Sequence, residues 1–347
     1  MAVIDQYFTE MQRAGASDLH MVIGFPPMIR LKGELTALDH PVLTAESNRD
    51  ILFEILRDEQ RETVQQNLDF DMAYELQGVG RFRCNFFYQF RGIGAVFRII
   101  PTEILTLAQL NLPEVLKKIA GYTKGLVLVT GPTGSGKSTT LAAMINYINE
   151  SVDGHIITIE DPLEFVHQNK RCLMTHREIG THAKSFSDAL RVASRENPDI
   201  ILVGEMRDLE TISLALTCAE LGILVFGTLH TNSAAKTIDR IINAFPANQQ
   251  AQARTMLSDS LRAVIAQQLL KTKDGKGRCA ANEILTGSQA LSSMIREGKI
   301  SQISSLIQTG TSAGMQSMDH HLKQLVQEDR ITREAAYEKA MDKSLFS

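Results

Sequence analysis

The stretch that decides the fold of this chain is Gly125-Leu-Val-Leu-Val-Thr-Gly-Pro-Thr-Gly-Ser-Gly-Lys-Ser138. The aliphatic run at 126–130 predicts a buried strand, and a helical pattern begins at Lys137 after a glycine-rich turn. Residues 131–138 match the pattern G-x-x-x-x-G-K-S/T in the strand-to-helix setting that this pattern requires. The stretch therefore predicts an α/β protein with a mainly parallel sheet.

The glycine-rich turn has the chemistry of a phosphate-binding loop. Its glycines let backbone amides turn inward around phosphate oxygens, and the N-terminus of the following helix adds positive potential. Lys137 is expected to reach the β- and γ-phosphates, and the Ser138 hydroxyl to ligate Mg²⁺. The predicted nucleotide contacts in the loop are Gly131, Pro132, Thr133, Gly134, Ser135, Gly136, Lys137, Ser138 and Thr139.

Three further aliphatic runs predict the neighbouring strands. They lie at 156–160, 200–203 and 223–228 and alternate with helical patterns, which indicates a sheet covered on both faces. Ligands in such sheets bind beyond the carboxyl ends of the strands. Polar residues that directly follow these runs are therefore candidates for the chemistry.

Carboxylates and a histidine occupy those positions. Glu205 follows the run at 200–203 and is expected to hold Mg²⁺ through water. The run at 156–160 leads into three carboxylates, Glu160, Asp161 and Glu164. One of them could orient the water that attacks the γ-phosphate, but their spacing does not select which. An acidic turn without a catalytic role explains the three residues equally well. His230 either hydrogen-bonds the γ-phosphate or packs as a structural histidine.

Composition narrows the class of protein. The 347 residues are 44% hydrophobic and 22% charged, which is ordinary for a globular protein of two or three domains. The formal net charge of −4 does not indicate general nucleic-acid binding, which a strongly basic protein would suggest. The four cysteines form no CxxC pair, which argues against a zinc module. No N/T-K-x-D tetrapeptide is present to read guanine, which disfavours a GTPase.

The sequence also predicts where the protein resides. No apolar run approaches the roughly 20 residues that span a bilayer. Asp5 and Glu10 stand where a signal peptide needs a basic start and an apolar core. We therefore expect a cytoplasmic protein.

The first hundred residues predict a small α+β unit. Helical patterns cover 2–14 and 47–66, and short strands are expected at 19–23 and 28–32. Three more strands follow, the last at 95–100, where it carries Arg98 and is stopped by Pro101. From about residue 288 onward the pattern is helical throughout.

The strand expected at 81–88 separates its side chains into two faces. Phe82, Cys84, Phe86 and Tyr88 alternate with Arg81, Arg83 and Asn85 in the period of two that is typical of a half-buried strand. The alternation places Arg81 and Arg83 together on the face away from the aromatic side.

With these residues the chain resembles the secretion and pilus-motor ATPases, and among them the PilT-type retraction motors of type IV pili. The resemblance implies a PAS-like N-terminal domain at 1–101, a linker at 102–111, a RecA-like P-loop ATPase core at 112–287 and a C-terminal helical region at 288–347. Besides the loop and the acidic box at 156–165, the motifs are Ser17-Asp-Leu-His20, Gly80-Arg-Phe-Arg83, Phe97-Arg-Ile-Ile-Pro101, Val203-Gly-Glu-Met-Arg-Asp208, Thr228-Leu-His-Thr231, Ala234-Ala-Lys-Thr-Ile-Asp-Arg240 and Gly314-Met-Gln-Ser-Met-Asp319.

The resemblance also implies an activity and partners. It implies a homohexamer that binds ATP between its subunits and hydrolyses it with Mg²⁺. Hydrolysis would rotate the domains, and this rotation would act on an inner-membrane pilus platform protein. The motor would work at the cytoplasmic face of the inner membrane, held there by its partners, and drive pilus retraction and twitching motility. Glu164 matches the catalytic base and Glu205 the atypical Walker B acid. Arginines implied as nucleotide contacts are Arg81, Arg83 and Arg98, with Arg195, Arg207 and Arg240 as further candidates in cis or in trans.

Two departures from the family keep alternatives open. Ile223 stands where relatives usually carry a second histidine, and the retraction motif AIRNLIREGK is half kept at 290–299. An accessory retraction paralogue therefore stays an alternative. An extension or type II secretion ATPase fits less well, because it usually carries a longer N-terminal region and a four-cysteine zinc module; a DNA-transfer secretion ATPase is also disfavoured. A nucleotide-dependent scaffold that hydrolyses weakly is the alternative from another class.

Overall fold

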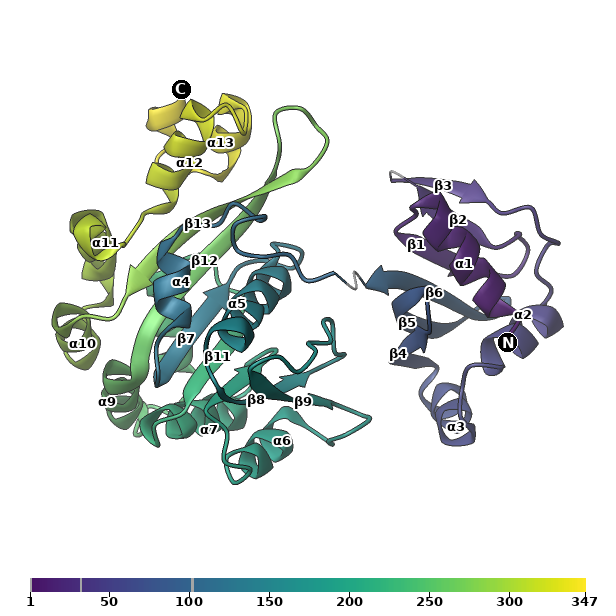
Figure 1. Ribbon diagram of the computed structural model, residues 1–347, viewed down its shortest axis with the longest axis horizontal. Helices are drawn as coiled ribbons and strands as arrows, with labels where there is room; N and C mark the ends of the chain where they lie inside the picture. Colours follow the sequence, from purple (N-terminus) through teal and green to yellow (C-terminus); the bar gives the residue numbers. More distant parts are fainter. Residues whose placement is uncertain (1, 32, 101–102) are drawn as a thin grey trace. The chain divides into compact units, whose positions relative to one another are not determined.

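A computed structural model of the chain describes residues 2–31, 33–100 and 103–347. The chain forms two compact units (Figure 1). The N-terminal unit contains the chain up to Glu103 together with Pro162–Val166, and the core unit contains Ile104–Asp161 and His167–Ser347. The predicted end of the first domain at residue 101 and start of the linker at residue 102 lie outside the described residues, as does residue 32, the predicted last residue of a strand.

The N-terminal unit has one antiparallel sheet, with strands in the order β3-β2-β1-β6-β5-β4. This agrees with the small α+β domain that the sequence predicts. Its elements are α1 (Ile4–Ala14), β1 (Asp18–Met21), β2 (Met28–Leu31), β3 (Glu34–Ala37), α2 (Ala45–Phe53), α3 (Asp58–Asn67), β4 (Asp69–Leu76), β5 (Gly80–Gln89) and β6 (Gly92–Ile100).

Strand β5 confirms the predicted alternation as far as Phe86, but Tyr88, at the end of the strand next to the turn into β6, is 38% exposed. Phe82, Cys84 and Phe86 are fully buried in the core of the N-terminal unit. The ring of Phe82 stacks on that of Phe8 from α1, with centroids 4.1 Å apart. The arginines of β5 lie on the other face of the strand, as expected for a period of two.

The single helix predicted at 47–66 is wrong, because the structure has two helices there. α2 ends at Phe53, and α3 begins after Arg57, whose backbone is extended with φ −70° and ψ 158°. The Gln60 side chain accepts the Arg57 N–H, and Arg61 donates two hydrogen bonds to the Phe53 carbonyl. Side chains thus satisfy the backbone groups at both helix ends, which stabilises the break.

The core unit has one sheet with strands in the order β13-β12-β7-β11-β10-β8-β9. Neighbouring strands are parallel, except that β13 pairs antiparallel with β12. Its strands are β7 (Gly125–Thr130), β8 (Gly154–Glu160), β9 (Cys172–Glu178), β10 (Ile200–Val203), β11 (Leu224–Leu229), β12 (Leu261–Lys271) and β13 (Arg278–Thr286).

Helices cover both faces of the core sheet (Figure 1). Those that follow or precede the strands are α4 (Val115–Ala120), α5 (Lys137–Ser151), α6 (Phe186–Ala193), α7 (Leu209–Glu220), α8 (Ala234–Asn243) and α9 (Gln250–Ser260). Val127 and Val129 of β7 pack in the layer that contains α4 and α5, and Leu126 and Leu128 pack in the layer of α6 to α9. Strands with two apolar faces are typical of a parallel sheet between helices.

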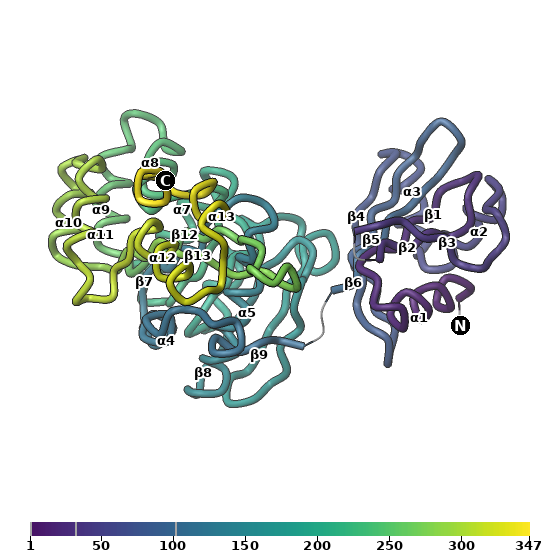
Figure 2. The backbone as a smooth tube through the Cα atoms, turned by 90° about the horizontal axis from the view of Figure 1, so that it is seen from above, coloured from purple at the N-terminus to yellow at the C-terminus, as the bar shows by residue number. Residues whose placement is uncertain are grey.

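Residues 288–347 form helices, as predicted. They are α10 (Gln289–Arg296), α11 (Ile303–Thr309), α12 (Met318–Gln327) and α13 (Arg333–Lys339), with short 3₁₀ turns at Ile300–Gln302, Thr311–Ala313 and Lys343–Phe346. Figure 2 shows α12 and α13 beside β12 and β13, where Leu322 and Leu325 pack on Leu270. These helices belong to the same compact unit as the sheet, so the predicted boundary after residue 287 lies inside that unit and stays a prediction.

The helical region also covers the outer edge of β13. Gln316 exchanges backbone hydrogen bonds of 2.8 and 2.9 Å with Ile284, and His321 accepts the Asn282 N–H at 2.9 Å. An edge strand would otherwise expose unpaired backbone groups. Within the described part of the chain, no helix is both long enough and apolar enough to cross a bilayer.

Candidate functional site

The phosphate-binding loop connects β7 to α5 at the carboxyl edge of the core sheet. Gly131, Gly134 and Gly136 have φ values of 149°, 76° and 83°, a region that side chains disfavour. Gly136 is the N-cap residue of α5, so the loop leads directly into the helix N-terminus. The conformation that the glycine pattern predicts is therefore present, with the backbone turned for anion binding.

The side chains of the loop are arranged around its backbone. Lys137 Nζ donates hydrogen bonds of 3.0 and 3.2 Å to the carbonyls of Gly131 and Pro132, which places its charge over the loop. Ser138 and Thr139 lie half-buried in the first turn of α5, and Ser135 is buried. An ammonium group over a loop of inward-turning amides is suited to phosphate oxygens.

Backbone hydrogen bonds hold the strand ends together beside the loop. The N–H of Gly204, just after β10, donates a 2.8 Å hydrogen bond to the carbonyl of Ile159 in β8. The N–H of Met206 donates a 3.0 Å hydrogen bond to the carbonyl of Thr228 in β11. A Cβ on Gly204 would lie only 3.2 Å from the Ile159 carbonyl oxygen, so glycine permits this close approach. The residue between them, Glu205, is thereby fixed at the edge where ligands bind.

Glu205 and His230, both predicted from strand ends, are in direct contact. Glu205 Oε1 lies 2.8 Å from His230 Nε2 and 2.6 Å from Arg207 Nε, and Oε2 lies 2.7 Å from the other end of the Arg207 guanidinium. The Glu205 side chain is 19% exposed. Arg207, predicted only as a candidate nucleotide contact, is thus a partner of the carboxylate.

The charge of Glu205 is maintained by these partners. Burial by itself raises the pKa of the carboxyl group, but the hydrogen bonds and charges of Arg207 and His230 outweigh burial and leave the pKa below its usual value. The same pairing raises the pKa of Arg207. Glu205 is therefore an anion at neutral pH.

The acidic box begins at the same edge. Glu160 is the last residue of β8, and its carbonyl accepts the Ile179 N–H at 2.9 Å; Asp161 follows and is exposed. Glu164 is half-buried in the segment Pro162–Val166, between the buried Leu163 and Phe165. Its role as the base stays a prediction.

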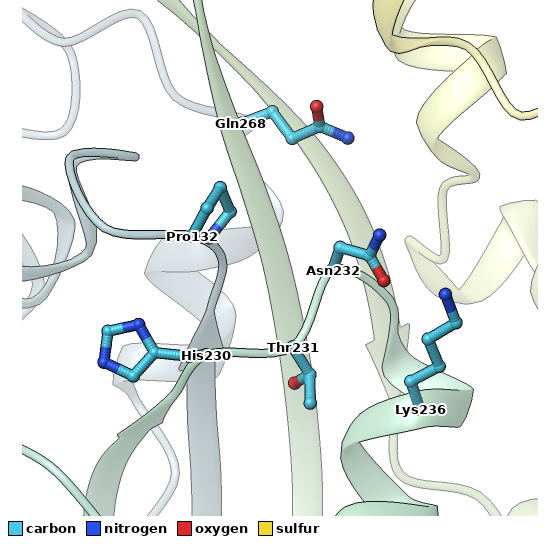
Figure 3. Close-up of a pocket in the computed structure, with 6 residues that line it drawn as sticks. All are labelled: Pro132, His230, Thr231, Asn232, Lys236 and Gln268. Atoms are coloured by element: carbon cyan, nitrogen blue, oxygen red, sulfur yellow. The ribbon is translucent and has the colours of Figure 1, made fainter.

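A cavity of about 430 Å³ lies beside the loop (Figure 3). Its lining includes His230, Thr231 and Asn232, which follow β11, and Lys236 from the first turn of α8. Pro132 of the loop and Gln268 of β12 complete the lining. The His230 ring points away from Lys236, toward the side on which it meets Glu205.

Two of the predicted arginines lie on the polar face of β5 in the N-terminal unit. Arg81 Nη1 is 3.9 Å from Glu75, and Arg83 Nη2 is 4.0 Å from Asp71, across the β4–β5 pair. Arg83 keeps 45% of its side chain exposed. Long ion pairs of this kind contribute little to stability.

Arg98 adds a second positive charge in register with Arg83. The two arginines are directly opposed across β5 and β6, and Arg98 is opposed on its other side by Asp18 of β1. Arg98 Nε lies 2.8 Å from Asp18, whose side chain is 6% exposed. Burial raises the pKa of Asp18, but hydrogen bonds from Ser17 and Arg98 outweigh it and lower the pKa overall. Each arginine of this opposed pair thus has a carboxylate beside it, Asp71 for Arg83 and Asp18 for Arg98.

The last two candidate arginines are exposed. Arg195 follows α6, and the carbonyl of its neighbour Glu196 contacts His155 near the start of β8, which is the edge of the sheet opposite the loop. Arg240 lies in the last turn of α8. Within the core unit neither is brought to the loop, and their roles stay predictions.

The oxygen ligands at the loop suit Mg²⁺. A hydroxyl at Ser138 and an ionised carboxylate at Glu205 are hard donors, and this cation keeps several waters and phosphate oxygens as its other ligands. Among the residues that the structure describes, no group of three or more His, Cys, Asp or Glu side chains is placed to hold a metal by itself. The residues therefore fit a cation that arrives with a nucleotide.

Gln267 is a site residue that sequence reasoning does not find. It lies in β12 with 1% of its surface exposed, and its side chain donates a 2.6 Å hydrogen bond to the Ser135 carbonyl. The available signal is the pair of glutamines inside the aliphatic run 264–270. A buried polar residue in such a run indicates a specific partner.

Comparisons with known proteins agree with this geometry. A family model described as "Type II/IV secretion system protein" matches residues 1–345. The Pseudomonas aeruginosa "Type IV pilus retractation ATPase PilT" is 55% identical over 94% of this chain and 95% of its own length. A Neisseria gonorrhoeae "Twitching motility protein" is 54% identical over 92% of this chain and 86% of its own length.

A solved structure is similar across the fold as well. A crystal structure of the pilus retraction motor PilT with bound ADP has a TM-score of 0.92, with 44% identity, over 99% of this chain and 98% of that one. The predicted α/β fold class is thereby confirmed. Since the family model spans nearly the whole chain, the protein belongs to the type II/IV secretion system protein family.

Proposed function

We propose that this protein is an ATP-hydrolysing motor that retracts a type IV pilus. The observation that carries the proposal is the phosphate-binding loop at the carboxyl edge of the core sheet, with the Glu205–His230 pair at the adjoining strand ends. Relatives over 94% and 92% of the chain include a pilus retraction ATPase and a twitching motility protein, and a similar crystal structure holds ADP.

The residues of the loop divide the work of binding. Loop amides hold the phosphates of the substrate and of the transition state alike. The charge of Lys137 favours the transition state, in which negative charge is spread over the γ-phosphoryl oxygens. Ser138 would hold Mg²⁺ directly and Glu205 would hold it through water, and the cation would supply positive charge against the phosphate oxygens. His230 orients the Glu205 carboxylate through their 2.8 Å contact.

Glu164 is proposed as the base that orients the attacking water. Its half-buried position between Leu163 and Phe165 supports this role, because a carboxylate anchored by apolar neighbours is held in place. Glu160 and Asp161 are the alternatives within the same box. Turnover of Glu164→Gln against Glu160→Gln and Asp161→Asn would rank the three.

We further propose a homohexamer with ATP between subunits. Arg81, Arg83 and Arg98 would contact the nucleotide from an N-terminal unit, and the position of Arg195 away from the loop of its own chain supports a contact in trans. An arginine that arrives from a neighbour couples hydrolysis to subunit geometry. The ring would act on an inner-membrane platform protein at the cytoplasmic face.

The decisive experiment is deletion of the gene in the source organism, scored for surface pili and for twitching motility. We expect abundant pili that no longer retract. Complementation with Lys137→Ala should fail, while the exposed α12 variant Lys323→Ala should restore motility. Bald cells would show an extension motor instead, and unchanged pili and motility would overturn a pilus role.

Purified protein tests the enzyme claim separately. Wild type and Lys323→Ala should release phosphate from ATP at equal rates, and Lys137→Ala and Glu205→Ala should not. Equal phosphate release by all four proteins would contradict the proposed ATPase.

A further inference from the structure

Gln267 joins the phosphate-binding loop to the helix that follows it. Its Nε2 donates to the Ser135 carbonyl at 2.6 Å, and its Oε1 accepts from the Thr140 hydroxyl at 2.8 Å. Ser135 is in the loop and Thr140 is in α5, and each is no more than 3% exposed. One side-chain amide therefore bonds to both sides of the turn that holds the phosphates.

The hydrogen bonds set the orientation of the amide. Its oxygen also accepts from Asn282 Nδ2 at 2.9 Å, so two donors meet the oxygen while the nitrogen meets a carbonyl. A carboxylate could not donate to Ser135, and an apolar side chain of the same size could make none of the bonds. These hydrogen bonds thus require an amide at position 267, whereas packing alone would accept any side chain of similar size.

Two glycines of the loop lie against the same residue. A Cβ on Gly131 would be 2.3 Å from the Gln267 carbonyl oxygen, and a Cβ on Gly136 would be 2.9 Å from Gln267 Nε2. The loop therefore packs on β12 at both of its ends, against the Gln267 carbonyl at Gly131 and against the Gln267 side chain at Gly136. Because these contacts are close, a shift of Gln267 would move the loop.

Gln267 is itself supported from the C-terminal helices. Asn282 is fully buried and pairs in register with Gln267 across β12 and β13. The Asn282 N–H donates to His321 Nδ1 at 2.9 Å, and its carbonyl accepts from Gln316 Nε2 at 2.9 Å. The contacts run from α12 through β13 and β12 to the loop.

We propose that Gln267 is a positioning residue for nucleotide binding, which holds the phosphate-binding loop in its binding conformation through Ser135 and Thr140. The inference rests on the nucleotide binding of the proposed function. Without the amide, the buried Ser135 carbonyl and Thr140 hydroxyl lose their partners, and the loop shifts to recover hydrogen bonds. The loop amides then no longer converge on the phosphates.

The test is the affinity of the full-length chain for ADP and ATP, measured by titration with a fluorescent nucleotide analogue and by competition. Gln267→Met keeps the volume and removes the hydrogen bonds. We expect its Kd for both nucleotides to rise by about tenfold or more. The control Gln324→Met, an exposed position on α12, should keep the wild-type Kd.

A second pair of variants separates positioning from general destabilisation. Thr140→Val removes the hydroxyl that donates to Gln267, and Thr140→Ser retains it. The serine variant should keep the wild-type affinity and the valine variant should lose several-fold. Because the loop binds substrate and transition state alike, KM should rise while kcat changes little. If Gln267 had a purely structural role, the variants would have a lower melting temperature, but KM would not rise at a constant kcat.

The outcomes distinguish the inference from the function on which it rests. Wild-type affinity in folded Gln267→Met would overturn the inference and leave ATP binding intact. If Gln267→Met does not fold, equal Kd values for Thr140→Val and Thr140→Ser would overturn it. A wild-type chain that binds no ADP would overturn the proposed function, and the inference with it.

Discussion

Glu205 and His230 follow different strands, yet Glu205 Oε1 lies 2.8 Å from His230 Nε2. The contact exists because β10 and β11 are parallel neighbours whose carboxyl ends meet at one edge of the sheet. His230 therefore contacts the carboxylate that is proposed to hold the metal through water. A histidine in this place can convey a change at the carboxylate to β11 and to the start of α8.

The first prediction concerns this pair. His230→Ala should lower the rate of ATP hydrolysis roughly tenfold or more, because the Glu205 carboxylate loses one of the two groups that orient it. Affinity for ADP should stay near that of wild type, since the loop is untouched. The matched control is His320→Ala, at an exposed position of α12. A wild-type turnover rate in His230→Ala would contradict a role in hydrolysis.

The second prediction compares two glycines of the loop. Gly131→Ala should reduce nucleotide affinity and thermal stability strongly, because its Cβ would lie 2.3 Å from the Gln267 carbonyl and 2.5 Å from Ser135 Oγ. Gly134→Ala has no atom within 4 Å of its Cβ and bears only the strain of φ 76°, about 1–2 kcal/mol. Melting temperature and ADP titration measure both. Equal losses in the two variants would mean that packing against β12 is unimportant.

The third prediction concerns the arginines of the N-terminal unit. Arg83 and Arg98 are opposed in register, and both are proposed to contact the nucleotide. Arg83→Gln should lower hydrolysis several-fold without lowering the melting temperature, because it removes a ligand contact while its 4.0 Å ion pair with Asp71 contributes little to stability. Arg49→Gln, whose ion pair with Asp50 is exposed, is the control. Unchanged hydrolysis in Arg83→Gln would remove this arginine from the site.

The fourth prediction is a pH dependence of stability. Burial lowers the pKa of His321 to about 4, whereas an unfolded histidine titrates near 6.5. Between these values the unfolded state binds the proton and the folded state does not, so stability is full above about pH 6.5 and falls as the pH drops toward 4. Burial also lowers the pKa of His167 to about 4, which adds to the slope.

His321→Gln should flatten that slope, because glutamine can accept the Asn282 N–H without a proton to gain. The expected change is up to about 1.4 kcal/mol per pH unit in the free energy of unfolding. Chemical denaturation at several pH values measures it, with His320→Gln at the neighbouring exposed position as control. An equal slope in wild type and His321→Gln would exclude His321 as the source.

The parts of the protein that sequence predicts well are those encoded locally. The loop at 131–138, the helix from Lys137 and the strand ends that carry Glu205 and His230 lie where periodicity and motif place them. The break between α2 and α3 is missed because it depends on how Gln60 and Arg61 bond to backbone groups, which periodicity does not encode.

By itself, the sequence of this protein determined a phosphate-binding loop on a parallel sheet, a small α+β N-terminal unit and the family, because these follow from neighbouring residues. Only the tertiary structure decided which distant residues support the loop. Gln267 meets Ser135 across 132 positions of sequence, and it does so because β12 pairs with β7. Strand order is set by the packing of whole helical layers, so the contacts that hold the nucleotide loop appear only once the sheet is assembled.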